Sequence, residues 1–295
     1  MDDRIQDFLR FLDAEKGYAE NTVAAYRNDL GQFTRYANEL GQEKDNFRWA
    51  DIDRAAITTY ITHLQEQGYT SSTVARKVAA IKSFFHFLVA EGTVKDDPTA
   101  TLDSPKVKKR PPKAISTGEI EQLLEAPTTG SGPKAQRDHA LLELLYASGT
   151  RVTELVSLNI EDVGIDSDSN SGEVHVYNKK NPAKKRTIPI SGSALQALRT
   201  YLERGRLQLV RTPDEEALFL NHRGQRLTRQ GLWLIIKRYV EMVGISEEVT
   251  PHTLRHSFAA HKLSQGKSLQ DIQKLLGHAN ISTTQVYTHL SKEAE

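Results

Sequence analysis

The chain has 295 residues, of which 38% are hydrophobic, so it is long enough for two domains of ordinary size, each with its own core. It contains no cysteine, which excludes disulfides, thiolate metal sites and cysteine nucleophiles, and its net charge of +1 neither supports nor excludes a polyanionic partner. The start MDDRIQDFLR does not have the pattern of a signal peptide, and no apolar stretch approaches ~18 residues, so we expect a cytoplasmic protein without membrane spans.

The first hundred residues have the apolar spacing of a helical domain. Ile5, Phe8 and Leu12 open the pattern, which then repeats in three further segments. Asn21 is predicted to cap the second helix and Gly41 to end it. The four predicted helices lie near residues 5–12, 23–40, 57–64 and 71–88, the last beginning at Ser71 or Ser72.

A basic, proline-containing segment separates this part from the rest. DSPKVKKRPPK, residues 103–113, holds three prolines and five basic residues and cannot form a packed helix or a central strand. It predicts an extended linker, which is either a solvated tether or a strap along a phosphate backbone. Basic side chains also lie off the apolar stripe of the fourth helix, where they are either solvated or in contact with DNA. The candidate DNA contacts are Arg76, Lys77, Lys82, Lys106, Lys108, Lys109 and Arg110.

The part after the linker mixes helices with a small amount of strand. Ser116 and Glu119 form a capping box, and Gly149 ends an apolar helix, DHALLELLYASG. GEVHVYNKKNPAKKRTIPI alternates as a β-hairpin with a basic tip, and ALFLNHRGQRLT predicts a second, short hairpin. Further helices are expected over residues 232–243, 251–263, 269–276 and 283–290, so the fold class is mainly α with an α+β second domain.

The stretch TPHTLRHSF raises the question of a metal site. His252 and His256 lie four residues apart, a spacing that suits a metal, but Arg255 between them would hold a permanent cation next to that metal. Thr250 and Pro251 place the group at a helix start, where a guanidinium fork and a histidine suit a phosphate. The alternative is that His252 is a structural hydrogen-bonding residue.

Two further segments carry side chains of the same chemistry. In SGTRVTEL, Thr150 is predicted to cap a helix that Arg151 opens, and helix starts bind phosphate. In SLQDIQKLLGHANISTTQVYTHL, Gly277 places His278 on a turn, and Tyr287 lies on a last helix that Ser282 can cap. Taken alone, Arg151 could equally be a surface residue and Tyr287 a buried aromatic residue.

Together, GTRVTEL, HTLRHSFAAHKL and LLGHANISTTQVYTH resemble the catalytic motifs of tyrosine recombinases, the phage-integrase family, in order and spacing. The resemblance is nearest to the Xer type and extends over essentially the whole chain. It implies a helical, SAM-like core-binding domain over residues 1–102, a linker over 103–113, and a catalytic domain of the DNA-breaking-rejoining fold over 114–295.

The resemblance also implies a set of catalytic residues. The lysine is assigned from the register of VYNK, but this sequence departs from the family there, because Lys180, Asn181 and Pro182 follow. Lys180 or Lys184 could therefore have the role, and His256 is interpreted as structural support. The implied catalytic residues are Arg151, Lys179, His252, Arg255, His278 and the nucleophile Tyr287.

The implied activity is site-specific recombination of double-stranded DNA through a 3′-phosphotyrosyl intermediate and a free 5′-hydroxyl. It would need no metal, ATP or other cofactor, and would use a homo- or hetero-tetramer on paired sites, possibly activated by a septal DNA translocase. An Xer-like resolution of chromosome or plasmid dimers is the first expectation. The alternatives are the integrase of a mobile element, a type IB topoisomerase and a non-catalytic DNA-binding protein.

Overall fold

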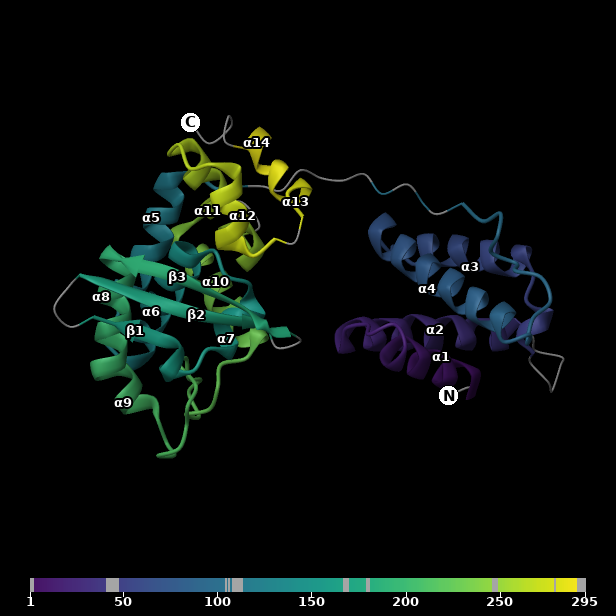
Figure 1. The fold of residues 1–295 in the computed structure, drawn as a ribbon, viewed down its shortest axis with the longest axis horizontal. Coiled ribbons are helices and arrows are strands. Elements are labelled where there is room, and N and C mark those ends of the chain that lie inside the picture. Colours follow the sequence, from purple (N-terminus) through teal and green to yellow (C-terminus); the bar gives the residue numbers. More distant parts are fainter. Residues whose placement is uncertain are drawn as a thin grey trace. The chain divides into compact units, whose positions relative to one another are not determined.

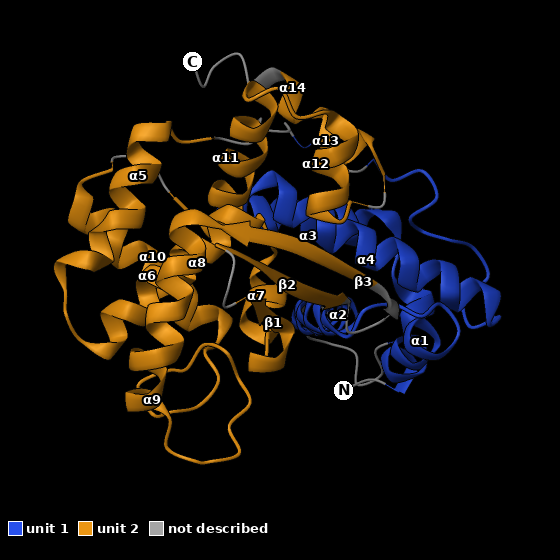
Figure 2. Ribbon diagram, turned by 60° about the vertical axis from the view of Figure 1, so that its left-hand side comes forward, with its two compact units in different colours: residues 1–110 blue, residues 111–295 orange. Residues whose placement is uncertain are grey.

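The computed structural model describes residues 3–40, 48–103, 105, 107, 114–166, 170–178, 181–245, 249–278 and 280–290, with only the backbone for 40, 178, 181–184, 289 and 290. The chain divides into two compact units, residues 1–110 and 111–295, shown in different colours in Figure 2. No helix in the described part of the chain is both long enough and apolar enough to cross a membrane.

Unit 1 is a helical bundle in which all four predicted helices are present. Their apolar stripes meet in an aromatic core, where Phe8, Phe33 and Phe84 are at most 1% exposed. Trp49, on a short 3₁₀ turn, closes this core by packing edge-on against Phe84, with ring centroids 4.7 Å apart. The helices are α1 (Asp3–Ala14), α2 (Glu20–Leu40), α3 (Arg54–Glu66) and α4 (Ser71–Ala90).

Side-chain caps define where two of these helices begin. The Asp53 carboxylate accepts the N–H of Ala56 at 2.8 Å at the start of α3, and the Thr70 hydroxyl caps α4. The prediction that Asn21 caps α2 is wrong, because the helix begins at Glu20 and includes Asn21 in its first turn. Gly41, its predicted end, lies outside the described residues.

Unit 2 packs its helices around one small antiparallel sheet (Figure 1). The core is formed by buried aliphatic side chains of α6, the sheet and α10, among them Leu142, Ile188 and Ile236. The elements are α5 (Thr117–Glu125), α6 (Pro133–Ser148), α7 (Val152–Ser157), β1 (Val163–Ile165), β2 (Ser171–Asn178), β3 (Asn181–Ser191), α8 (Gly192–Thr200), α9 (Arg206–Leu209), α10 (Arg229–Val243), α11 (Pro251–Ser264), α12 (Leu269–Leu276), α13 (Ser282–Gln285) and α14 (Tyr287–Leu290).

The sheet contains the predicted hairpin and one additional strand. β2 pairs with β3 so that Val174 lies opposite Ile188 and Val176 opposite Arg186. β1, which the sequence pattern did not predict, adds to the other edge of β2. On β3, residues 186, 188 and 190 share one face by the two-residue period of a strand. This face points into unit 2, where Ile188 and Ile190 are at most 3% exposed.

The end of α6 is fixed by close packing. Gly149 has φ 55°, the left-handed conformation that favours glycine after a helix. A Cβ at this position would lie 2.5 Å from Cδ1 of Phe258 on α11. The chain therefore leaves α6 in direct contact with α11, and this contact sets the place of the next residues, Thr150 and Arg151.

Two predicted elements of unit 2 differ from the structure. The predicted last helix over residues 283–290 is two short helices, α13 and α14, separated by a turn at Val286, and Ser282 is the first residue of α13 rather than its cap. The second predicted hairpin is a tight antiparallel turn, in which Asn221 N–H donates to the Gln225 carbonyl at 2.7 Å.

Candidate active site

Arg255 is a buried arginine of the predicted catalytic set. It lies on the second turn of α11 and is 5% exposed. One Nη donates to the carbonyl of Gly149, and the other donates to the carbonyl of Leu276 at 2.7 Å. Burial, and then the charge of nearby Arg151, lower the pKa of Arg255 to about 10, so it remains a cation at neutral pH.

Arg151 lies beside Arg255 but is more accessible. The sequence predicted Arg151 as the first residue of a helix. In the structure α7 begins one residue later, at Val152, and Arg151 directly precedes it. Its side chain is 42% exposed, and Nη2 donates to the Gly277 carbonyl at 3.3 Å. Arg151 and Arg255 thus bind neighbouring carbonyls at the C-terminal end of α12, where the helix dipole favours cations.

A third arginine, which the sequence analysis did not identify, completes this arrangement. Arg186 of β3 donates from Nε to the Leu275 carbonyl at 3.1 Å. Three consecutive carbonyls, those of residues 275, 276 and 277, therefore each bind a different arginine. The arginines come from β3, α11 and the start of α7, so the end of α12 brings three distant segments of the chain together.

Glu154 neutralises part of this charge. Its carboxylate accepts Nη1 of Arg151 at 3.0 Å, the Arg151 N–H at 2.8 Å, and both Nη groups of Arg186 at 2.9 and 2.7 Å. Burial alone would raise its pKa, but the hydrogen bonds from Arg186 and Arg151 outweigh burial and lower the pKa of Glu154 to about 2. Glu154 is therefore an anion at neutral pH, shared by two guanidiniums.

His278 is held as a neutral imidazole. An arginine can only donate, so the contact of 3.1 Å between Arg255 Nη2 and His278 Nε2 makes Nε2 an acceptor. Nδ1 then carries the hydrogen and donates to the Thr284 hydroxyl at 2.9 Å. Burial, followed by the charges of Arg255 and Arg151, lowers the pKa of His278 to about 4.

Tyr287 lies at the edge of the same site, and its hydroxyl is bound to a histidine. The residue is 2% exposed, and its ring stacks on that of His278 with centroids 6.3 Å apart. The hydroxyl is 2.9 Å from Nδ1 of His256. Burial raises the pKa of Tyr287, while the charges of Arg255 and Arg151 act in the opposite direction.

Comparison with known protein families identifies the family of this chain. The Phage integrase family matches residues 113–294, and its N-terminal SAM-like domain matches residues 5–92. The chain belongs to the phage integrase family of tyrosine recombinases.

The relatives of this recombinase match along nearly their full length. It is 48% identical to tyrosine recombinase XerC of Herpetosiphon aurantiacus, over 99% of this chain and 92% of that protein. It is 41% identical to tyrosine recombinase XerD of Halalkalibacterium halodurans, over 99% of this chain and 94% of that protein. The predicted family and its Xer type are thereby confirmed.

Solved structures share the fold. XerH recombinase in a post-cleavage complex with its difH substrate has a TM-score of 0.76 at 21% identity, over 98% of this chain and 92% of that one. A lambda integrase tetramer bound to a Holliday junction has a TM-score of 0.74 at 18% identity, over 97% of this chain and 76% of that one. The predicted fold class is confirmed.

The two histidines of HTLRH lie in different surroundings in this recombinase. His252, one of the implied catalytic residues, is exposed on the first turn of α11. His256 is half-buried and holds the tyrosine hydroxyl, so it does more than the structural support that the sequence suggested. Burial, and then the charges of His252 and Arg255, lower the pKa of His256 to about 4, so its imidazole is neutral at pH 7.

The structure describes no side chain for the predicted hairpin lysines or for the basic residues of the linker. Lys179 and Lys180 lie outside the described residues, and for Lys184 only the backbone is described. The linker residues Lys106, Lys108, Lys109 and Arg110 are also outside the described residues.

The basic residues of α4 are tied into unit 1. Arg76 pairs with the Asp29 carboxylate, and its side chain is 49% exposed. Lys77 is 5% exposed and donates to Asp29 at 2.9 Å, so we exclude Lys77 from the DNA contacts that we propose. Lys82 is half-buried and donates to the Leu102 carbonyl, which fixes the end of unit 1.

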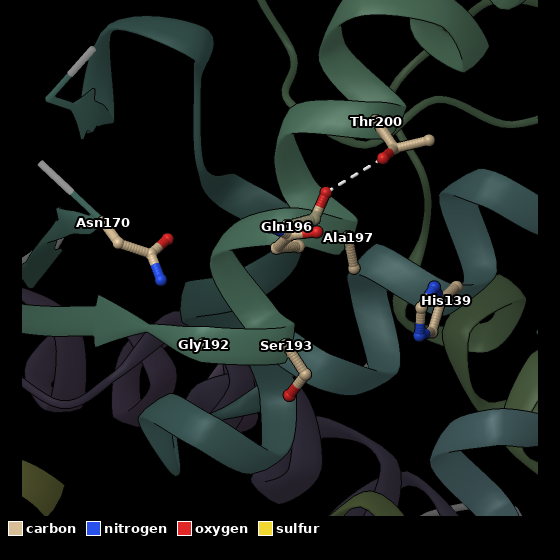
Figure 3. A pocket seen from close by; sticks show the side chains of 7 residues that line it. All are labelled: His139, Asn170, Gly192, Ser193, Gln196, Ala197 and Thr200. Carbon is tan, nitrogen blue, oxygen red and sulfur yellow. Dashed lines mark hydrogen bonds between the residues drawn. The ribbon is translucent and has the colours of Figure 1, made fainter. Parts of the chain in front are cut away.

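A separate hollow lies on unit 2, between α6, α8 and the start of β2. Its lining includes His139, Asn170, Ser193 and Gln196 (Figure 3). None of the predicted catalytic residues that the structure describes borders it. Its lining mixes polar side chains with Gly192 and Ala197, and we assign it no part in the chemistry of the recombinase.

Proposed function

We propose that the protein is a site-specific DNA recombinase of the Xer type, which transfers a DNA phosphodiester to the oxygen of Tyr287. The bond from phosphorus to the 5′-oxygen breaks as the bond to the tyrosine oxygen forms, giving a 3′-phosphotyrosyl link and a free 5′-hydroxyl. The link conserves the energy of the phosphodiester, so rejoining needs no ATP. The observation that carries the proposal is the pair Arg151 and Arg255, held on neighbouring carbonyls at the end of α12, with His278 in contact with both Arg255 and Tyr287.

The arginine pair would bind the non-bridging oxygens of the scissile phosphate. Negative charge on these oxygens grows in the transition state, so fixed cations stabilise it more than the ground state. Arg255 is already held by Gly149 and Leu276 and needs no reordering when DNA binds. Arg151, at 42% exposure, offers the more open side of the pair to the DNA.

Tyr287 would leave its buried position to reach that phosphate. In the structure its hydroxyl is hydrogen-bonded to Nδ1 of His256, and the residue is buried. We propose that DNA binding moves α14 and frees the phenol from His256. His252, exposed one turn earlier on α11, would then accept the phenol's proton at the phosphate.

His278 would change its hydrogen bonding when DNA binds. With Nδ1–H donated to Thr284, its Nε2 has no hydrogen to give to a phosphate oxygen. The cations that lower its pKa would be neutralised by the bound phosphate, which favours a second proton on Nε2. His278 could then donate to the phosphate. The hairpin lysine, assigned to Lys179, would protonate the leaving 5′-oxygen.

Binding would rest mainly on the DNA backbone and weaken steeply with salt. We propose that Arg76 and the linker residues Lys106, Lys108, Lys109 and Arg110 contribute phosphate contacts. The XerH structure is a complex with a DNA substrate, and the lambda integrase structure is a tetramer bound to a Holliday junction. The same assembly on paired sites is proposed here, acting on chromosomal or plasmid DNA in the cytoplasm.

The test uses genomic fragments selected by the purified protein. A bound fragment is rebuilt as a nicked suicide substrate, on which a cleaved strand cannot be rejoined. Wild type should form a covalent protein–DNA adduct, and a plasmid carrying two such sites should recombine. Relaxation of supercoils without exchange between sites would indicate a type IB topoisomerase, and binding without any adduct would indicate a non-catalytic DNA-binding protein.

A further inference from the structure

Arg186 is a charged residue at an inward-facing position of a strand. It shares one face of β3 with Ile188 and Ile190, which are at most 3% exposed, and its own side chain is 18% exposed. A charge at such a position is costly unless it is paired and fully hydrogen-bonded. An aliphatic residue would fill a sheet position of this kind without that requirement, so the pairing of Arg186 needs an explanation.

The partners of Arg186 all belong to the active site. Its two Nη groups form a fork on the Glu154 carboxylate at 2.9 and 2.7 Å, and Nε donates to the Leu275 carbonyl at 3.1 Å. The guanidinium also packs against the turn that carries His278, because a Cβ at Gly277 would lie 2.9 Å from its Nη1. Arg186 therefore connects β3 with the start of α7 and the end of α12.

Glu154 links Arg186 to Arg151. The same carboxylate accepts the Arg151 N–H at 2.8 Å and Arg151 Nη1 at 3.0 Å. Two arginines, Arg151 and Arg186, bind the Glu154 carboxylate in these contacts. Without Arg186, Glu154 would remain an anion and Arg151 alone would pair with it. The carboxylate would then draw Arg151 away from the side that faces the DNA phosphate.

We propose that Arg186 is a positioning residue for DNA cleavage. It touches no reacting atom, and it acts by sharing Glu154 with Arg151 and by holding the turn that carries His278. The proposal rests on the proposed function and assigns to the inner face of β3 a part in the same reaction. It predicts that Arg186 matters for the rate of cleavage and not for the strength of DNA binding.

The experiment measures cleavage and binding separately. Arg186→Gln and Arg186→Lys are compared with wild type for the rate of adduct formation on the nicked substrate at saturating DNA. Both should be slower, by up to about 10²-fold, since small misplacement of a catalytic group has effects of that size. Lysine should recover only part of the rate, because one ammonium cannot form the fork. The slope of log affinity against log salt should stay unchanged.

Two further variants separate positioning from stability. Arg226 is a matched control: it is also half-buried in unit 2 and donates to the Val156 and Leu158 carbonyls, with no contact to Glu154. Arg226→Gln should keep the wild-type cleavage rate even where it lowers the Tm. Glu154→Gln combined with Arg186→Gln should be no slower than Arg186→Gln alone, because Arg186 acts on Arg151 through the charge of Glu154.

Four results would overturn the proposal. The first is cleavage by Arg186→Gln at the wild-type rate. The second is a salt slope reduced by about one, which marks a direct phosphate contact. The third and fourth are additive effects of Arg186→Gln and Glu154→Gln on the cleavage rate, and an equal loss of cleavage rate in Arg226→Gln. If Arg186→Gln does not fold, the same criteria apply to Arg186→Lys. Absence of an adduct in wild type would instead contradict the proposed function itself.

Discussion

The hydroxyl of Tyr287 and Nδ1 of His256 lie 2.9 Å apart, and the tyrosine is 2% exposed. The proposed nucleophile is thus held in a hydrogen bond to a neutral imidazole, away from solvent. In the proposed mechanism, the hydroxyl would have to exchange His256 for the phosphate before reaction, which would limit unprogrammed cutting of DNA.

Replacing His256 should loosen this storage. We expect His256→Ala to speed adduct formation at saturating DNA by about fivefold, the factor that corresponds to a lost hydrogen bond of about 1 kcal/mol. Single-turnover cleavage of the nicked substrate measures this. A loss of cleavage would show that His256, rather than His252, takes the proton from the phenol.

Removing the phenolic oxygen should abolish chemistry and leave binding intact. Tyr287→Phe should bind the DNA site with wild-type affinity and form no adduct. Its free energy of unfolding should fall by about 1 kcal/mol, because the contact to His256 is lost. Gel shifts and denaturing gels report the two effects. An adduct formed by Tyr287→Phe would identify another nucleophile.

The two guanidiniums should differ in their effect on stability. Arg151→Lys and Arg255→Lys should each slow cleavage by about 10²–10³-fold, the usual loss for one preorganised donor. Arg255→Lys should also lower the Tm, because the buried carbonyls of Gly149 and Leu276 lose their donors. Arg151, at 42% exposure, should affect the Tm less. Equal Tm losses would contradict this difference.

Acid should destabilise unit 2 in two stages. His256 and His278 have pKa values lowered to about 4, below the ~6.5 of an unfolded histidine, so the unfolded state binds more protons between these values. Stability therefore falls as the pH drops from about 6.5 to about 4. It falls further toward about pH 2 as Glu154 protonates. Tm measured against pH checks this, and His278→Gln should flatten the first stage. A Tm that rises on acidification would refute the assignment.

Gly149 should not tolerate a side chain. Gly149→Ala adds a Cβ 2.5 Å from Phe258 at φ 55°, and we expect a loss of about 2 kcal/mol or more in the free energy of unfolding. Gly244 is the matched control, since it ends α10 at φ 73° with nothing within 4 Å of the added Cβ. Urea unfolding of both variants separates the clash from the cost of the backbone conformation. Equal losses would mean that the clash relaxes.

Local patterns predicted much of this fold because they depend on neighbouring residues. The apolar spacing gave all four helices of unit 1, and Ser116 with Glu119 forms the predicted capping box. The strand β1 was missed because three residues, Val163–Ile165, carry too little alternation to recognise. The break between α13 and α14 at Val286 was missed because residues 282–290 suit one continuous helix. The packing of α14 against α11 and of α13 against α12 is not visible in the sequence.

The site was predictable where a motif supplies the residue and unpredictable where a long-range contact does. Arg151, Arg255 and His278, which the motifs supply, lie together at the end of α12. Glu154 stands inside a quoted motif, but its role depends on Arg186, 32 residues later in the chain. His256 was placed in a supporting role because a helix offsets it by about 40° from His252, and the sequence does not say which of these directions faces Tyr287.

The three adjacent carbonyls at the end of α12 have a consequence for engineering. Because each accepts a different arginine, adding or deleting one residue in this helix would put all three side chains out of register at once. Chimeras between relatives should therefore exchange residues 269–278 together with Arg151, Arg186 and Arg255 as one module, while the outward side of the helix remains open to redesign.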